Sequence, residues 1–274
     1  MSGKSCVSGR VAEADIRVDV PGRYQDPDAP LRLMPVMKLA SKYEIDAMRK
    51  RIVALVEDTW PRSLEQWLLF HAQANVIQDT YDVADGQFIC GKDFARRVPE
   101  PAVAVCIVRD FDIPSVLPCA YYTLACISFD HDWGTNEKPS LPLALGYALA
   151  RWHMLDIVDM ETVLRGWEEL VRIMALNVRW ASVKRVRDVL ESCMGCDDFC
   201  QIKASAIQVR WKRSVSVDFR EVQCSDPLGI LQGIYEEHSQ WEVCYMCTAA
   251  LKRCVRSQQE YIWGRLSEIF GVNC

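Results

Sequence analysis

The sequence predicts a mostly α-helical protein, and three observations carry that prediction. Apolar residues recur at steps of three and four in most apolar segments, which is the periodicity of a helix with one buried face. Residues typical of helix starts and stops separate these segments, and no run of alternating strands appears. With 274 residues, 50% of them apolar and 25% charged, the chain resembles an ordinary globular protein and can bury a sizeable core.

The first predicted helices follow a polar arm. Residues 1–30 are polar and end in several prolines, so we expect a loosely ordered segment. Residues 36–58 (VMKLASKYEIDAMRKRIVALVED) predict a short helix, a break and a longer helix. Pro35 is expected near the first turn of the short helix, because proline lacks the N–H of an interior position. The longer helix has one apolar face, formed by Ile45, Met48, Ile52 and Leu55.

The middle of the chain predicts further helices with one loop. Ser63 and Gln66 have the spacing of a capping box, so a helix should begin near residue 64. Residues 75–99 lose helical periodicity and contain two glycines, which favours a loop. Residues 102–110 and 115–129 are two apolar helices separated by Pro114.

The second half continues in the same way. We expect a helix over residues 143–153 and a long helix capped at its start by Asp159. A helix through Ile202, Ala206 and Val209 follows. Asp226 followed by Pro227 predicts the start of another helix. The last long helix is expected over about residues 241–269, with Gly271 beyond its end.

Three segments together resemble a known family. LASKYEIDAMRKRIVALVED (39–58) is similar to the last helices of a BTB/POZ domain, where ALxxAxKYxIxxLRxxxxxxL is typical. YIWGRLSEIFGV (261–272) resembles the C-terminal LWxRLPxxFGL signature of a large fungal group of BTB proteins. LDIVDMETVLRGWEELV (155–171) resembles the LSPEDLxRCLxGRExL segment of the same group.

This resemblance implies an architecture and a function. Residues 31–60 would be the C-terminal helices of a BTB-like domain, and residues 61–274 a BACK-like α-helical domain. The expected role is non-catalytic protein–protein interaction, as an intracellular adaptor or scaffold in the cytoplasm or nucleus. The strand pair and FxVHxxxLxxxSxxF segment that open a BTB domain have no counterpart here, which argues against dimerisation and cullin binding. A truncated gene model or a decayed paralogue would account for this.

The missing part of the BTB fold also predicts a binding surface. Without it, part of the apolar face of the second helix should be uncovered and available to a protein partner. The predicted partner-binding residues are Tyr43, Ile45, Met48 and Ile52.

The 13 cysteines are the one unusual feature of the composition. They are scattered through apolar runs, and no signal peptide is recognisable, so we expect reduced thiols and an intracellular protein. Two CxxC pairs leave a structural zinc site as the alternative function, although their separation exceeds that of known zinc ribbons. The pairs are Cys193 with Cys196 and Cys244 with Cys247, and Cys200, Cys224 and Cys254 lie nearby in sequence. Otherwise we expect buried thiols and no cofactor.

Other classes of function find no support in the sequence. No GxSxG, HExxH or GxGxxG motif occurs, so we do not expect an enzyme. The net charge of −5 provides no basic field for nucleic acid or an anionic membrane. The longest stretch without a charged residue, 113–129, contains two prolines, so we interpret it as a core helix and expect no membrane span.

Overall fold

The computed structural model describes residues 27–82, 99–134, 149–175, 182–191, 200, 209, 226–236 and 242–272. Within these residues the chain is α-helical, as predicted, and its only β-type pairing is one isolated bridge between Asp132 and Ala150. None of the described helices has the length and apolarity needed to cross a membrane. Of the predicted arm, residues 1–26 lie outside the described part, as do all but Val209 of the helix predicted through Ile202 and Ala206.

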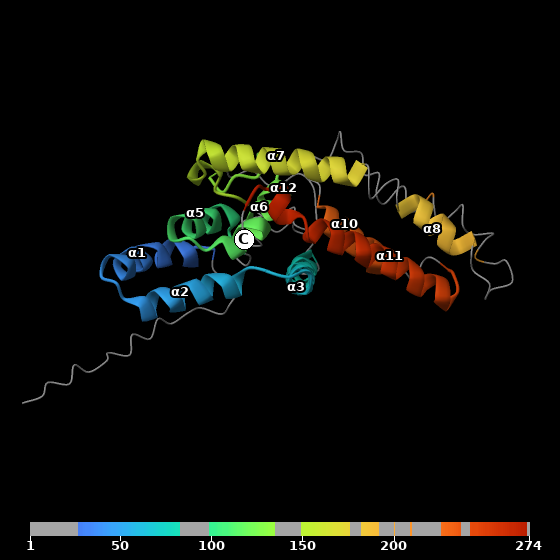
Figure 1. The fold of residues 1–274 in the computed structure, drawn as a ribbon, viewed down its shortest axis with the longest axis horizontal. Helices are drawn as coiled ribbons and strands as arrows, with labels where there is room; N and C mark the ends of the chain where they lie inside the picture. The colour runs from blue at the N-terminus through green and yellow to red at the C-terminus, as the bar shows by residue number, and fades with distance from the viewer. Residues whose placement is uncertain are drawn as a thin grey trace, which may run out of the picture.

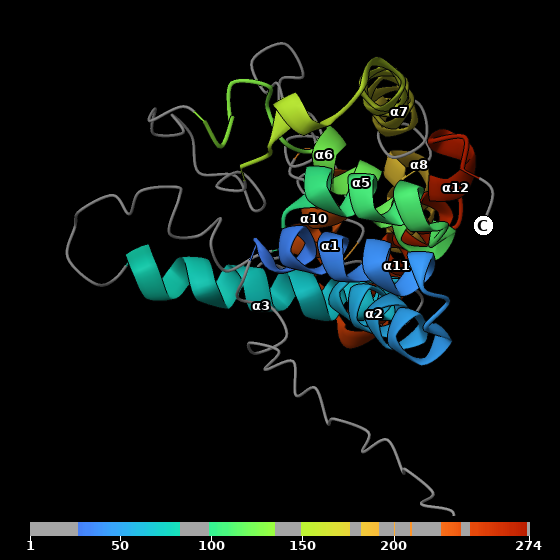
Figure 2. The same cartoon turned by 90° about the vertical axis from the view of Figure 1, so that its left-hand side faces the viewer.

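The helices form an elongated assembly around α6, which lies near its centre (Figure 1). In contact with α6 are α5, α7 and α12, and α1 packs against both α2 and α5. At the opposite end α11 packs against α8, α10 and α3 (Figures 1 and 2). The elements are α1 (Ala29–Lys42), α2 (Asp46–Thr59), α3 (Leu64–Asp82), α5 (Pro101–Phe111), α6 (Leu117–Ala125), α7 (Ile157–Ile173), α8 (Ser182–Glu191), α10 (Pro227–Glu236), α11 (Tyr245–Trp263) and α12 (Leu266–Ile269), with 3-10 turns at Pro114–Val116 and Trp152–Met154.

The predicted helix pair in residues 36–58 exists as the hairpin of α1 and α2. A Schellman motif ends α1: the Ile45 N–H donates to the Ala40 carbonyl at 2.8 Å, and Glu44 adopts the left-handed conformation with φ of 53°. The expected position of Pro35 was wrong. Pro30 occupies the first turn and α1 begins at Ala29, so Pro35 lies inside the helix, at the loss of one backbone hydrogen bond.

Two other boundaries differ from their predictions. The Ser63 hydroxyl accepts the Gln66 N–H, as the predicted cap requires, but α3 then continues to Asp82 instead of giving way to a loop at residue 75. No glycine or proline interrupts the chain before Gly86, so helical hydrogen bonding can persist despite weak periodicity. The helix predicted over 115–129 ends at Ala125, where Cys126 and Ile127 donate to carbonyls three residues back.

A buried polar group joins α3, α6 and α10. The Tyr122 hydroxyl donates to Asp226 Oδ1 at 2.5 Å, and the same carboxylate accepts the Gly229 N–H at 2.9 Å, which confirms Asp226 as the predicted cap of α10. His71 Nε2 lies 4.0 Å from Asp226 Oδ2. Trp67 stacks on the His71 ring with centroids 4.9 Å apart. Aromatic packing and a shared carboxylate thus fix three segments that are far apart in sequence.

The start of α7 is organised by two aspartates, and the predicted cap was wrong by three residues. Asp156 is the N-cap, and its Oδ1 accepts the Asp159 N–H at 2.9 Å. Asp159 completes the capping box from the third position and also accepts the Tyr121 hydroxyl at 2.8 Å and Arg109 Nη1 at 2.6 Å. The sequence spacing alone would allow either aspartate to be the N-cap of α7. In the structure Asp159 binds Tyr121 of α6, and Asp156 is the N-cap.

Glu100 contacts the described end of the segment that was predicted to be helical over residues 143–153, where only a 3-10 turn occurs. It is 1% exposed, and its carboxylate caps α5 by accepting the Val103 N–H at 2.6 Å and also accepts the Arg151 N–H at 2.8 Å. The chain at Ala150 therefore pairs with residues 131–133, and only a 3-10 turn follows. Residues 143–148 lie outside the described part.

Burial raises the pKa of Glu100 above its ordinary value, although three backbone N–H groups and Arg151 oppose that shift. We expect the free energy of unfolding to fall as pH rises from the ordinary glutamate pKa through the raised one. In that interval the folded chain holds a proton that the unfolded chain has released. Denaturant titrations across this pH range should show a flatter dependence for Glu100→Gln. The control Glu65→Gln, at an exposed carboxylate with a lowered pKa, should change the slope only at and below the ordinary glutamate pKa and keep the wild-type fall in stability above it. Equal slopes for all three proteins above that pKa would contradict the prediction.

The predicted last helix is divided into two. α11 ends at Trp263, the chain turns at Gly264, and α12 packs against α6 and α7. Phe270 stacks on Tyr121, with ring centroids 5.8 Å apart. Gly271 has φ of 62° and ends α12 in a Schellman motif, as predicted, with the Val272 N–H donating to the Ser267 carbonyl at 2.9 Å.

Candidate functional site

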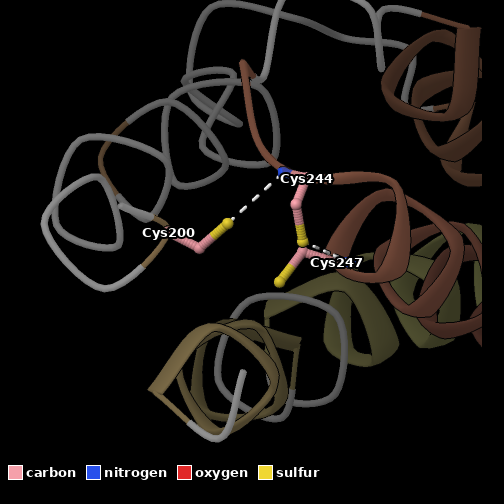
Figure 3. A group of neighbouring side chains, drawn as sticks. All are labelled: Cys200, Cys244 and Cys247. Carbon is pink, nitrogen blue, oxygen red and sulfur yellow. Dashed lines mark hydrogen bonds between the residues drawn. The ribbon is translucent and has the colours of Figure 1, made fainter. Parts of the chain in front are cut away.

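Three cysteine side chains converge where α11 begins. The Sγ atoms of Cys200, Cys244 and Cys247 all lie within 4.8 Å of one another, and the side chains point toward a common centre (Figure 3). No other group of three metal-ligating side chains occurs among the described residues. We call these three residues the cysteine cluster.

The local sequence explains how α11 presents two of these sulfurs. Cys244 is the N-cap of α11, and its Sγ accepts the Cys247 N–H at 3.4 Å. A spacing of three residues places a cap and the third helical position on the same side of the first turn. The first turn also carries the positive end of the helix dipole, which favours negative charge on nearby sulfur atoms.

The third sulfur comes from a separate segment. Cys200 precedes Cys244 by 44 residues, and its Sγ accepts the Cys244 N–H at 3.3 Å. Cys200 and Cys247 are buried, whereas Cys244 is partly exposed. The cluster is therefore formed by tertiary structure and can be reached from the surface at one side.

The cluster agrees only in part with the zinc site predicted from sequence. Cys244 and Cys247 are brought together, but they lie at the start of the helix and not within it. Cys193 and Cys196 lie outside the described residues, as does Cys224. Cys200, which the sequence offered only as a neighbouring candidate, is the third member.

The cysteines in the centre of the protein behave differently. Cys119 on α6 and Cys126 just after its end are buried among apolar side chains, as expected for core thiols, and Cys106 on α5 is buried with its Sγ donating to the Met154 carbonyl at 3.3 Å. Burial raises the pKa of Cys119 to about 12 and that of Cys106 to about 11. Cys119 and Cys106 are thus protonated at neutral pH.

The predicted partner-binding residues divide into exposed and buried members. Tyr43 is 64% exposed and Ile45 44% exposed at the turn between α1 and α2, whereas Met48 is partly buried. Ile52 is 4% exposed and belongs to the core, so it cannot contact a partner in this fold. Sequence reasoning missed Leu39, which is 54% exposed one helical turn before Tyr43. We call Leu39, Tyr43 and Ile45 the hairpin tip.

Comparison with known proteins gives no match among family models, curated proteins or solved structures.

Proposed function

We propose that this chain is a non-catalytic protein–protein interaction module, an intracellular adaptor or scaffold that binds a protein partner through the hairpin tip. The supporting observation is the exposure of three large apolar side chains on one helical hairpin, two of them one turn apart on α1. Covering a side chain of this kind in an interface contributes about 1.5–3 kcal/mol. Exposed apolar side chains gathered in one place are typical of binding surfaces.

The charges around the hairpin tip indicate what such a partner would carry. Six basic side chains on the same hairpin are exposed, against the three exposed acids Glu44, Asp46 and Asp58. A partner segment with apolar residues flanked by acidic ones would match both features, and an amphipathic helix is the usual form of such a segment. The basic residues are Arg32, Lys38, Lys42, Arg49, Lys50 and Arg51.

We further propose that residues 31–60 correspond to the last helices of a BTB-like domain and residues 61–274 to a BACK-like helical region. The helical hairpin formed by the KYEI-containing segment supports this assignment, and so does the helical ending of the tail at Gly271. The presence or absence of BTB-type strands encoded in frame upstream of residue 1 would test it directly.

The double variant Leu39→Ser/Tyr43→Ser tests the interaction proposal. Proteins captured by the wild-type chain should be purified and their affinity measured by calorimetry, and we expect at least about tenfold weaker binding by the variant. The matched control is Ile157→Ser/Val158→Ser, which removes two exposed apolar side chains from the start of α7. A partner that binds both variants as tightly as the wild type would contradict a role for the hairpin tip.

A further inference from the structure

We propose that the cysteine cluster is a binding site for one zinc ion, with Cys200, Cys244 and Cys247 as its three protein ligands. The set keeps Cys244 and Cys247 from the predicted pairs and adds Cys200, whereas Cys193 and Cys196 lie outside the described residues. It is also independent of partner binding at the hairpin tip, which lies on different helices.

The distances are close to those a metal would impose. A tetrahedral zinc ion with bonds of about 2.3 Å to sulfur places its sulfur ligands about 3.8 Å apart. The three Sγ atoms already lie within 4.8 Å of one another. Side-chain rotations that move the sulfur atoms by about 1 Å would therefore bring them to zinc-binding distance. Larger backbone movements are unnecessary, because both segments are already joined by the hydrogen bond from the Cys244 N–H to Cys200 Sγ.

The surroundings favour thiolates at this position. Two backbone N–H groups already donate to sulfur atoms of the cluster, from Cys247 to Cys244 and from Cys244 to Cys200. N–H donors of this kind are the outer partners that orient metal-bound ligands. Three thiolates and one Zn²⁺ carry a net charge of −1, which the positive end of the α11 dipole stabilises.

The choice of zinc follows from the ligand chemistry. Thiolates are soft ligands, and an all-sulfur set from the protein selects zinc, copper(I) or an iron–sulfur cluster over magnesium or calcium. Zinc accepts a tetrahedral site without redox change, and three protein ligands leave one position for a fourth ligand. A zinc ion here would tie the segment at Cys200 to the start of α11, at the end of the molecule where α8 also packs.

Metal content of the full chain, purified without chelator, tests the proposal. We expect about one zinc per chain in the wild type, and about tenfold less in Cys200→Ser and in Cys247→Ser. The matched control is Cys254→Ser, on the same helix but about 10 Å further along its axis than Cys247, too far to share the ion. That control should retain its zinc.

A spectroscopic measurement keeps the test valid where a serine variant does not fold. Co²⁺ added to the metal-free wild-type chain should produce intense thiolate-to-cobalt charge-transfer absorption, and added Zn²⁺ should abolish it by displacement. The proposal would be overturned by a wild-type chain with neither zinc nor cobalt absorption. Zinc retained equally in all three serine variants, or stoichiometric copper or iron in place of zinc, would also overturn it.

Discussion

Asp159→Ala is expected to lower the free energy of unfolding by about 3–4 kcal/mol, because it removes the acceptor that joins three helices. Asp159 is 1% exposed, and its carboxylate accepts the Tyr121 hydroxyl and Arg109 Nη1 as well as the Asp156 N–H. Without it, the Tyr121 hydroxyl would be left buried without its acceptor. Arg109 is partly exposed and can turn to water, so its share of the loss is the smaller one.

Chemical denaturation of the purified chain measures this loss, and Asp156→Ala is the matched control. Asp156 caps the same helix and binds the same arginine, but half of its side chain is exposed. Its replacement should therefore cost about 1 kcal/mol, the usual value of an N-cap. In a double-mutant cycle Tyr121→Phe should cost much less in the Asp159→Ala background than in the wild type. Equal losses for the two aspartate variants would contradict the central role of Asp159.

Gly166→Ala is expected to destabilise the protein by about 2–3 kcal/mol, although alanine is ordinarily the better helix residue. A Cβ atom at Gly166 in α7 would lie 1.9 Å from Cε1 of Phe270. Phe270 is buried and stacked on Tyr121, so its ring cannot move aside without disturbing the contact of α12 with α6. The clash should outweigh the gain in helix propensity.

Thermal and denaturant unfolding measure the effect, with Gly233→Ala as control. Gly233 lies inside α10, and a Cβ there would meet nothing within 4 Å. The control should gain up to about 1 kcal/mol from propensity alone. Phe270→Leu is expected to cost stability by itself, yet to make the addition of Gly166→Ala nearly harmless. A stabilising effect of Gly166→Ala would contradict the prediction, because it would mean that the Phe270 ring can move aside without loss of stability.

The helical fold could be predicted because local signals carry most of it. The apolar run at residues 102–110 corresponds to α5, and the caps at Ser63, Asp226 and Gly271 lie where predicted. The errors arise where contacts with residues far away in sequence determine the start or end of a helix. The Arg151 N–H donates to Glu100, and the described residues 149–153 form only a 3-10 turn where the apolar run at 143–153 favours an α-helix. In the same way, Asp159 accepts the hydroxyl of the distant Tyr121, and Asp156 is the residue that caps α7.

The candidate sites show the same division between local and distant information. The sequence shows that Cys244 and Cys247 are three residues apart. Cys200 comes close to these two cysteines only when the chain folds. Tyr43 and Ile45 are exposed as predicted, whereas burial of Ile52 follows from the packing of the hairpin. The BTB resemblance, the domain boundary near residue 60 and the identity of a partner stay predictions.

The position of α12 has a consequence for biosynthesis. Residues 266–270 complete the surroundings of α6, a helix made about 150 positions earlier, by packing Phe270 between Gly166 and Tyr121. A nascent chain therefore carries α6 with one apolar side uncovered until those residues leave the ribosome. Contacts of such high sequence separation delay folding and expose the growing chain to aggregation.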